Sequence, residues 1–164
     1  DTIYTGAKFT RLYFKDCYID GTTDFIFGPS TALFEDCIIH SKRNSYVTAA
    51  STPKEAKYGY VFKHCKLTAE PGVDKVYLGR PWRPYAYTLF IECELGKHIV
   101  SAGWHNWGKQ SNEETARYME YKNTGEGANV SERVAWSKQL TKKEAEAVTV
   151  DAIFGTQSNW NPID

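Results

Sequence analysis

The sequence has no long hydrophobic run and no excess of charge of either sign. None of its apolar stretches approaches the roughly 20 residues that a membrane-spanning helix needs, so we expect no membrane partner. The 20 basic and 20 acidic side chains give a formal net charge of +0, and no basic stripe is present. A nucleic-acid partner is therefore not expected, because binding to the phosphate backbone needs such a patch. The sequence also opens without a charged leader or an apolar segment of the signal-peptide type, which leaves its compartment open.

The cysteines lack the spacing of a metal site. No Cys-x-x-Cys pair occurs, and no tight cluster with the cysteines is formed by the histidines, which are His40, His64, His98 and His105. Structural zinc sites draw on closely spaced ligands of these two types. We therefore expect no metal site.

Tight turns are scarce as well, while aromatic residues are frequent. The chain has no Asn-Gly and a single Asp-Gly, at Asp20-Gly21, whereas an antiparallel sandwich normally shows several two-residue turns. Phe, Tyr and Trp make up 15% of the residues, which favours strands. These features favour an all-β fold that is not assembled from hairpins.

A repeated pattern indicates which all-β fold this is. Four segments read Phe, two mostly polar residues, Cys, one variable residue, then Ile or Leu, and their cysteines lie 20, 28 and 28 residues apart at Cys17, Cys37, Cys65 and Cys93. Such spacing is typical of solenoid coils whose equivalent strands stack as parallel neighbours while the loops differ in length. We expect residues 1–164 to form a single domain, a right-handed parallel β-helix, with a β-sandwich as the alternative. On an ideal strand each Phe would face away from its Cys, which would share a face with the Ile or Leu.

Two local expectations follow from the sequence. Cys17 and Cys37 belong to successive coils and come within disulfide range if the coils stack in register, although buried free thiols fit equally well. Thr141 and Glu144 have the spacing of a capping box, which predicts a short C-terminal helix. We expect that helix to cover the open end of the stack.

One carboxylate stands in an apolar setting. Asp24 lies within residues 21–28 (GTTDFIFG), where a charge costs free energy to desolvate unless a partner pairs with it. Groups placed in this way are candidates for catalysis. A second motif, residues 78–82 (LGRPW), offers the partner in the guanidinium of Arg80. Together the two motifs predict a site of carboxylate chemistry.

These motifs, with residues 103–107 (GWHNW) and 118–125 (YMEYKNTG), resemble the pectin methylesterases in order along nearly the whole chain. Residues 1–4 (DTIY) are similar to the end of that family's QDTLY motif. The resemblance implies the C-terminal part of a right-handed parallel β-helix that hydrolyses the methyl esters of homogalacturonan (pectin) without a metal or other cofactor. Since pectin is extracellular, it also implies a secreted protein, extracellular or periplasmic.

The same resemblance assigns roles to individual residues. Asp24 matches the nucleophile, Asp1 the general acid/base, and Arg80 the residue that orients Asp24 and keeps it ionised. In this scheme Asp24 attacks the ester carbonyl, and Asp1 protonates the departing methoxide before activating water. Phe27 and Trp82 match aromatic residues of the substrate subsites.

Three more residues complete the set of candidates. Trp104 is a further ring that we expect to stack on substrate. Cys17 and Cys37 match a pair that is bridged in some family members, so the resemblance implies a disulfide between them.

The resemblance also implies that part of the site lies outside this sequence. The family places one glutamine directly before the acid/base aspartate and another on an earlier coil, both as oxyanion donors, and neither is among the 164 residues. Because one such donor is worth on the order of a hundredfold in rate, we expect the chain alone to be weakly active or inactive. We also expect a partner, either a missing N-terminal segment or a second chain, to cover the open first coil.

Two other functions stay open. Trp82, Trp104 and Trp107 would form the stacking surface of a non-catalytic, pectin-binding β-helix. Paired aspartates are also used by glycosidases, so a β-helical polygalacturonase or lyase is a less favoured alternative. Binding of pectin without release of methanol would indicate the first, and new reducing ends or unsaturated products the second.

Overall fold

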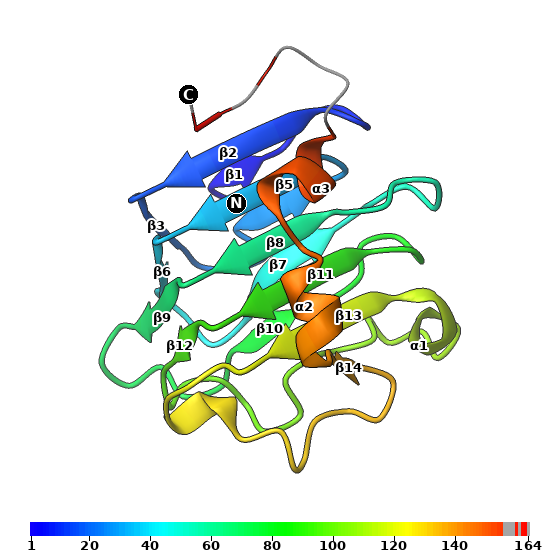
Figure 1. Cartoon of the computed structure of the whole chain (residues 1–164). Helices are drawn as coiled ribbons and strands as arrows, with labels where there is room; N and C mark the ends of the chain where they lie inside the picture. Colours follow the sequence, from blue (N-terminus) through cyan, green and yellow to red (C-terminus); the bar gives the residue numbers. More distant parts are fainter. Residues whose placement is uncertain (156–159, 161, 164) are drawn as a thin grey trace.

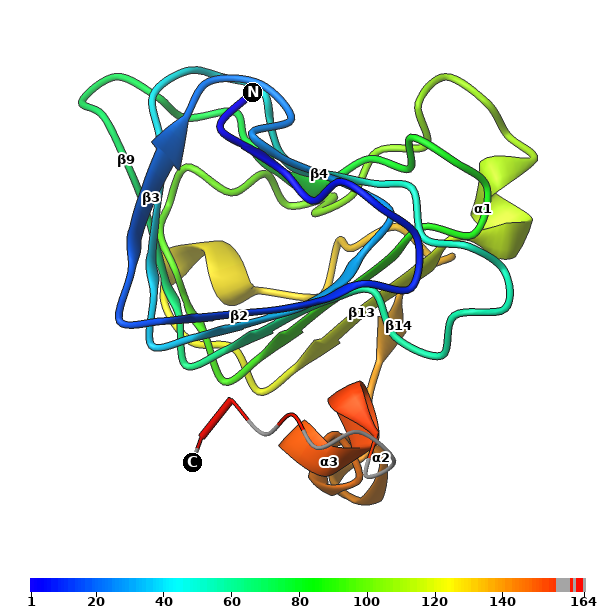
Figure 2. The ribbon, with the colours of Figure 1, turned by 90° about the horizontal axis from the view of Figure 1, so that it is seen from above.

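The computed structural model describes residues 1–155, 160 and 162–163. Every strand pair in this part of the chain is parallel, and the strands of successive coils stack into three sheets (Figure 1). Seen along the coil axis, the sheets form the walls of a tube (Figure 2). The fold is thus a right-handed parallel β-helix, as the repeat predicted, and the sandwich alternative is wrong.

The three sheets take one strand each from successive coils. Sheet A contains β1 (Ile3–Tyr4), β4 (Ile26–Gly28), β7 (Tyr46–Ala50) and β10 (Tyr77–Gly79). Sheet B contains β2 (Arg11–Lys15), β5 (Thr31–Glu35), β8 (Tyr60–Lys63), β11 (Tyr87–Ile91), β13 (Arg117–Tyr121) and β14 (Lys138–Gln139). Sheet C contains β3 (Tyr18–Gly21), β6 (Ile38–Ser41), β9 (Lys66–Ala69) and β12 (Glu94–Leu95). The helices are short: α1 (Asn112–Thr115), the 3₁₀ turn η1 (Glu126–Ala128), α2 (Lys142–Glu146) and α3 (Val150–Phe154).

The repeated phenylalanines form a continuous stack inside the tube. Phe14 and Phe34 have ring centroids 4.8 Å apart, Phe34 and Phe62 4.5 Å, and Phe62 and Phe90 4.4 Å, and the planes of the rings are nearly parallel. Identical residues meet in this way because each sheet B strand pairs in register with its neighbour, Phe14 opposite Phe34 and Phe34 opposite Phe62. The repeat in the sequence is therefore a repeat of core positions.

The corner between sheets B and C corrects one expectation. In each coil the residue just before the cysteine has a positive φ, at Asp16 (53°), Asp36 (54°), His64 (53°) and Glu92 (50°). This left-handed residue turns the chain, so the next side chain points back into the same interior. Phe34, Cys37 and Ile39 are all buried in one core cluster. The expectation that Phe and Cys face opposite sides is wrong, because it assumed a straight strand where the chain turns.

The cysteines are free thiols at all four positions. Cys17 and Cys37 do lie in successive coils in register, since the Ile38 N–H donates to the Cys17 carbonyl at 2.8 Å. The disulfide implied by the resemblance is nevertheless not formed. The Cys17 Sγ donates instead to the Lys15 carbonyl at 3.2 Å, and the Cys37 Sγ to the Glu35 carbonyl at 3.3 Å.

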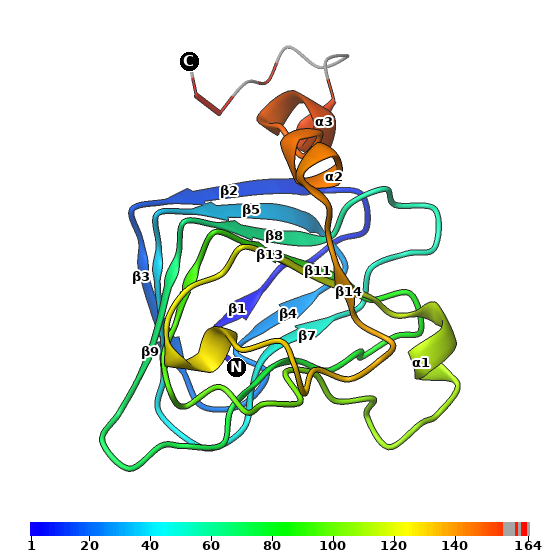
Figure 3. The ribbon, with the colours of Figure 1, turned by 60° about the horizontal axis from the view of Figure 1, so that its bottom comes forward.

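The capping box is present, but the helices that follow do not cover an end of the stack. The Thr141 side chain accepts from the Glu144 N–H at 3.3 Å, and the Glu144 carboxylate accepts from the Thr141 N–H at 2.8 Å, at the start of α2. Both α2 and α3 lie against the outer face of sheet B (Figure 3). That face is apolar, and it forms a second core with the helices through Leu33, Val61, Leu89, Val148, Ile153 and Phe154.

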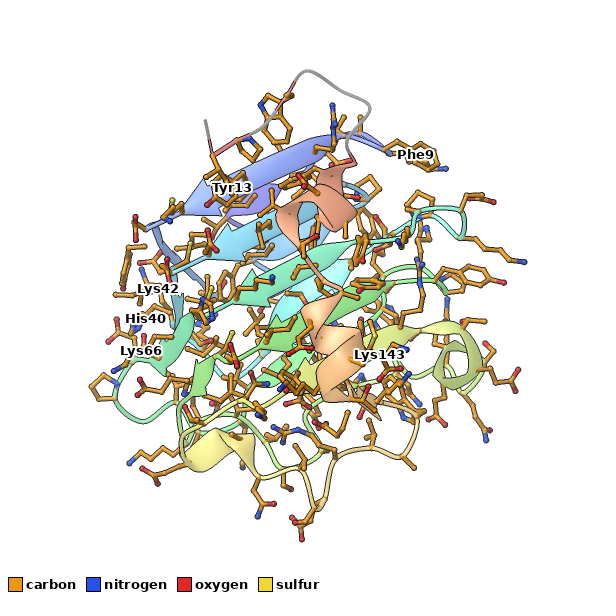
Figure 4. All side chains as sticks on the ribbon, in the orientation of Figure 1. Phe9, Tyr13, His40, Lys42, Lys66 and Lys143 are labelled. Atoms are coloured by element: carbon orange, nitrogen blue, oxygen red, sulfur yellow. The ribbon has the colours of Figure 1, made fainter. Side chains whose placement is uncertain are left out.

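At one end of the tube, three strands have no further strand beside them among the described residues. β1, β2 and β3 are each the terminal strand of their sheet, and all belong to the first coil (Figure 1). Exposed rings accompany them: Phe9 is 62% and Tyr18 60% accessible, and Phe9 projects away from the body of the chain (Figure 4). Main-chain edges of this kind are templates for further strand pairing.

No helix among the described residues has the length and apolar character needed to cross a membrane.

Candidate active site

Asp24 is held in an unusual backbone conformation just before β4. Its φ is 49°, in the left-handed region, and its N–H donates to the Tyr46 carbonyl of the next coil at 2.9 Å. Left-handed non-glycine residues persist where the surrounding structure fixes them, and they cluster at functional sites. The Asp24 side chain is 15% exposed. The carboxylate is therefore largely enclosed but reachable from outside the tube.

Arg80 meets this carboxylate through two parallel hydrogen bonds. Its Nε donates to Asp24 Oδ1 at 3.0 Å and its Nη2 to Asp24 Oδ2 at 2.7 Å. The residues are 56 positions apart in the sequence, and the coil brings them together because Arg80 directly follows β10 in the same sheet as β4. Bidentate pairs of this type fix direction as well as charge. The predicted pairing of the two motifs is thus present in the structure.

Two aromatic rings enclose the guanidinium. The Arg80 Cζ lies 4.0 Å from the ring centroid of Tyr46 and 3.9 Å from that of Trp107, so cation–π contacts act on it from two side chains. Burial works against the charged form of Arg80, but its hydrogen bonds to Asp24 and the charge of Asp24 outweigh this, and the pKa of Arg80 is raised. Arg80 is therefore a permanent cation with very little freedom to move.

The glycine of the LGRPW motif allows the close packing behind this pair. A Cβ on Gly79 would lie 2.2 Å from the Thr48 Oγ1 and 3.3 Å from the Trp104 ring. That Oγ1 donates to the Leu78 carbonyl at 2.9 Å, which ties β7 to β10. Any larger residue would push β10 outward and carry Arg80 away from Asp24.

An aromatic row runs beside the ion pair and consists of Tyr4, Phe27 and Trp82. The Tyr4 and Phe27 rings are stacked with centroids 5.0 Å apart, and Phe27 and Trp82 lie 6.0 Å apart. Tyr4 pairs with Phe27 across β1 and β4, so the two rings share one face of sheet A. Phe27 and Trp82 were both expected near the nucleophile, and the structure places them together. Tyr4 was not singled out in the sequence.

Trp104 does not belong to this surface. It is 1% exposed, its ring stacks on Tyr118 at 4.3 Å, and its Nε1 donates to Glu120 Oε2 at 3.3 Å. A ring enclosed on all sides has no face to offer a sugar, so the expected substrate contact is corrected to a core position. The neighbouring Trp107 is the one that reaches the site, through Arg80.

Asp1 lies at the edge of the site, and its carboxylate is not bonded to the other candidate residues. It is exposed, and the next residue is anchored, since the Thr2 N–H donates to the Phe25 carbonyl at 3.0 Å. Within the described residues no hydrogen bond or ion pair links the Asp1 carboxylate to Asp24 or Arg80. The structure therefore joins Asp24 to Arg80 and Phe27 to Trp82, and leaves Asp1 at the margin.

Three further aromatic neighbours, Tyr46, Tyr77 and His105, were not predicted as site residues from the sequence. Tyr46 stacks on Tyr77 at 5.3 Å, and His105 meets both rings edge-on at 5.4 and 5.3 Å. Burial, with the charge of Arg80 adding to it, lowers the pKa of His105, which favours a neutral ring beside the cation. The coil repeat was the available signal for Tyr46, because it lies about one coil after Asp24.

Among the described residues, no group of three or more His, Cys, Asp or Glu side chains is placed to hold a metal ion. The site itself contains one enclosed carboxylate, Asp24, bound by the guanidinium of Arg80.

Known proteins resemble this chain in sequence. The family model for pectinesterase matches residues 1–157. Pectinesterase 31 of Arabidopsis thaliana is 43% identical over 146 residues, which covers 88% of this chain and 45% of that protein. Probable pectinesterase A of Neosartorya fischeri is 38% identical over 165 residues, covering 98% of this chain and 47% of the relative. The chain thus spans about half the length of these curated relatives.

Solved structures agree with the sequences. The pectin methylesterase from carrot superposes with a TM-score of 0.84 at 33% identity, over 93% of this chain and 53% of that one. A pectin methylesterase crystallised in complex with hexasaccharide VII gives a TM-score of 0.77 at 30% identity, over 93% and 53% of the two chains. On the family match, the sequence relatives and the shared fold, this chain belongs to the pectinesterase family.

Proposed function

We propose that this chain carries the catalytic face of a pectin methylesterase, which hydrolyses the methyl esters of homogalacturonan to pectate and methanol. The observation that carries the proposal is the bidentate Asp24–Arg80 pair, enclosed by Tyr46 and Trp107 and flanked by the aromatic row. Family membership and the hexasaccharide bound to a related enzyme support pectin as the substrate.

Asp24 acts as the nucleophile. One of its carboxylate oxygens attacks the ester carbonyl carbon, and the tetrahedral intermediate collapses to an anhydride-type acyl-enzyme with loss of methoxide. Arg80 keeps the carboxylate in one orientation, so the attacking oxygen is positioned without further ordering. Water then attacks the anhydride, which releases the galacturonate carboxylate and restores Asp24.

Asp1 serves as the general acid and base. It gives a proton to the departing methoxide, which leaves as methanol, and in the second half-reaction it takes a proton from the attacking water. Its position beside the anchored Thr2 leaves it close to Asp24 along sheet A. Bound substrate would draw the exposed Asp1 side chain inward, because candidate acids in empty sites are often not yet aligned.

The first coil is proposed to be covered in the working protein. β1, β2 and β3 expose three parallel edges at one end, and the curated relatives are about twice as long as this chain. Further coils of the same protein, or a second chain, would satisfy those edges. Secretion is proposed on the same basis as the substrate, since pectin lies outside the cell.

The test is release of methanol from highly methyl-esterified pectin by the complete protein that the gene encodes, with the 164-residue chain assayed beside it. We expect methanol without new reducing ends, and loss of release in Asp24→Asn. Asp16→Asn is the matched control, because Asp16 is exposed and has a comparable φ of 53°.

Three results would overturn the proposal. Asp24→Asn with unchanged methanol release would remove Asp24 from the mechanism. New reducing ends or unsaturated products would indicate a polygalacturonase or lyase. Pectin binding without any methanol release would indicate the non-catalytic alternative. Two of the three rings proposed for that alternative are already engaged, because Trp104 is buried in the core and Trp107 packs on Arg80.

A further inference from the structure

The ring of Trp107, which packs on Arg80, belongs to a turn with an unusual backbone. Trp107 has a φ of 64° and Gly108 a φ of 68°, so two successive residues occupy the left-handed region. Glycine adopts this conformation readily, whereas a residue as bulky as tryptophan does so only where the surrounding structure enforces it. The contacts that hold the Trp107 backbone therefore also decide where its ring lies, 3.9 Å from the Arg80 Cζ.

Two side chains hold this turn, each by accepting from the backbone N–H two residues further on. The Trp107 N–H donates to His105 Nδ1 at 3.0 Å, and the Gly108 N–H donates to Asn106 Oδ1 at 2.8 Å. Asparagine commonly makes this local contact, and His105 makes the same one with a ring nitrogen. Asn106 is anchored in turn, because its Nδ2 donates to Glu113 Oε1 at 2.8 Å.

His105 also lies against the strand and the second ring that support Arg80. Its N–H donates to the carbonyl of Gly79, the residue before Arg80, at 3.1 Å. Its imidazole meets the Tyr46 ring edge-on at 5.4 Å, and Tyr46 packs on the guanidinium as Trp107 does. His105 thus contacts both aromatic side chains that enclose Arg80, although among the described residues no hydrogen bond joins its ring to Arg80 itself.

The hydrogen bond from Trp107 requires a neutral imidazole. A ring nitrogen that accepts a hydrogen bond carries no proton, so the single proton of neutral His105 resides on Nε2. Burial, with the charge of Arg80 adding to it, lowers the pKa of His105 and so favours this form. The titratable and charged groups that face the ring come from β7, from β10 and the residue after it, and from α1: Tyr46, Tyr77, Arg80 and Glu113.

We propose that His105 is a positioning residue for Arg80, because its Nδ1 holds the Trp107 backbone in the turn that lays the indole on the guanidinium. The contacts run from His105 through the Trp107 N–H and ring to Arg80, and from Arg80 through two hydrogen bonds to Asp24. Protonation of the imidazole turns Nδ1 into a donor that faces another donor, so the turn loosens in acid. The inference rests on the proposed function for its reaction, and it adds a residue that is not itself bonded to the nucleophile.

Hydrogen exchange, followed by NMR in the complete protein that the gene encodes, tests the contacts without relying on activity. Two protons are observed, the backbone amide of Trp107 and the Nε–H of Arg80 that is bonded to Asp24. His105→Phe keeps a ring but has no acceptor, and we expect both protons to exchange roughly tenfold faster, which is the scale of one lost hydrogen bond. His105→Asn should keep them protected, because an asparagine there can accept from the same N–H as Asn106 does from its own.

The same variants separate kcat from KM. His105→Phe should lower kcat for methanol release by roughly 2- to 10-fold with KM little changed, because His105 orients Arg80 rather than holding the polymer. His105→Asn should restore most of the rate. Its kcat should also fall less than that of the unmodified protein between about pH 6.5 and 5, since asparagine does not titrate where a histidine gains its proton. A merely structural role predicts neither this rescue nor the altered pH profile.

His64→Asn is the matched control. His64 is an exposed histidine at the corner between sheets B and C, and its φ of 53° suits asparagine. This variant should leave kcat and the exchange of both protons unchanged.

Two outcomes contradict the inference. Unchanged protection of the Trp107 amide in His105→Phe would show that His105 does not hold the turn. Faster exchange of that amide, with the Arg80 Nε–H and kcat both unaffected, would show that the turn does not act on Arg80. Failure of the proposed function looks different: the complete protein then releases no methanol, while the two exchange rates still decide whether His105 positions Arg80.

Discussion

The guanidinium of Arg80 faces the carboxylate of Asp24 with two parallel N–H···O bonds, of 3.0 and 2.7 Å. A lysine at the same place would supply charge without the planar fork or the ring stacking. We predict that Arg80→Lys lowers methanol release by on the order of a hundredfold or more, as removal of a positioned electrostatic group typically does. Arg43→Lys, at an exposed site, should leave the rate unchanged. A rate within twofold of the unmodified protein would show that orientation by Arg80 is dispensable.

Trp107 should matter through Arg80 alone. Its ring centroid lies 3.9 Å from the Arg80 Cζ, and a cation–π contact is worth about 0.5–2 kcal/mol. Trp107→Ala is therefore expected to reduce kcat by roughly 2- to 30-fold, while Trp107→Phe keeps most of the rate because a ring face is retained. If Trp107 instead bound substrate directly, KM would rise in both variants with kcat preserved.

The buried pair of Glu120 and Arg133 should be a large contributor to stability. Arg133 Nε donates to Glu120 Oε2 at 2.9 Å, and the two side chains are only 4% and 1% exposed. Arg133→Met leaves a buried carboxylate without its partner, which costs about 3–5 kcal/mol of unfolding free energy. Denaturant titration measures this. Lys142→Met breaks an exposed pair on α2 and should change stability by less than about 0.5 kcal/mol. Similar losses in both variants would contradict the prediction.

Acid should weaken the fold partly through His98. Burial, with a contribution from His40, lowers the pKa of His98 from 6.5 to about 4. Between these two values the unfolded chain binds a proton that folded His98 does not, so the free energy of unfolding falls as the pH falls. His98→Leu should flatten the dependence of stability on pH between about 6.5 and 4 relative to the unmodified protein. Gln110→Leu, which changes an exposed residue that does not titrate, should keep the original slope.

Arg117 should act as a positioning residue for the loops that follow β7 and β10. From β13 it donates to the carbonyls of Pro53, Ala56 and Tyr85, and so joins the two loops next to Trp82. Arg117→Met is expected to raise KM for partly de-esterified pectin severalfold with little change in kcat, while Arg117→Lys recovers part of the loss. A fall in kcat with KM unchanged would place its influence at Asp24 instead.

The spacing of the repeat predicted the coils, and charge pairing predicted the contact between Asp24 and Arg80. Each Phe-x-x-Cys unit occupies the same place in its coil, so the repeat reports stacked core positions such as Phe34 and Phe62 directly. The Asp24–Arg80 contact was predictable because an enclosed carboxylate needs a counter-charge. The helix start at Thr141 followed from local hydrogen bonding alone.

Other features depend on geometry that spacing does not encode. The left-handed residues at the B–C corner reverse the side on which the next cysteine lies, and nothing in the Phe-x-x-Cys pattern marks that turn. Tyr46 and Trp107 reach Arg80 from separate coils with loops of unequal length. These contacts could be predicted only with the register of the stacked coils, which the sequence does not give. Trp104 was mistaken for a surface ring because it follows an irregular loop, whereas the tube closes around it.

Sheet A combines a fixed framework with exposed loops. β1, β4, β7 and β10 are held by their neighbouring strands, yet the loop after each of them contributes a residue to one pocket, namely Lys8, Pro29, Lys54 and Arg83. A change of length or charge in one loop leaves the stacked phenylalanines untouched, because loops of a solenoid lie outside its inter-coil contacts. Each of these loops can therefore change on its own without altering the core or the Asp24–Arg80 pair.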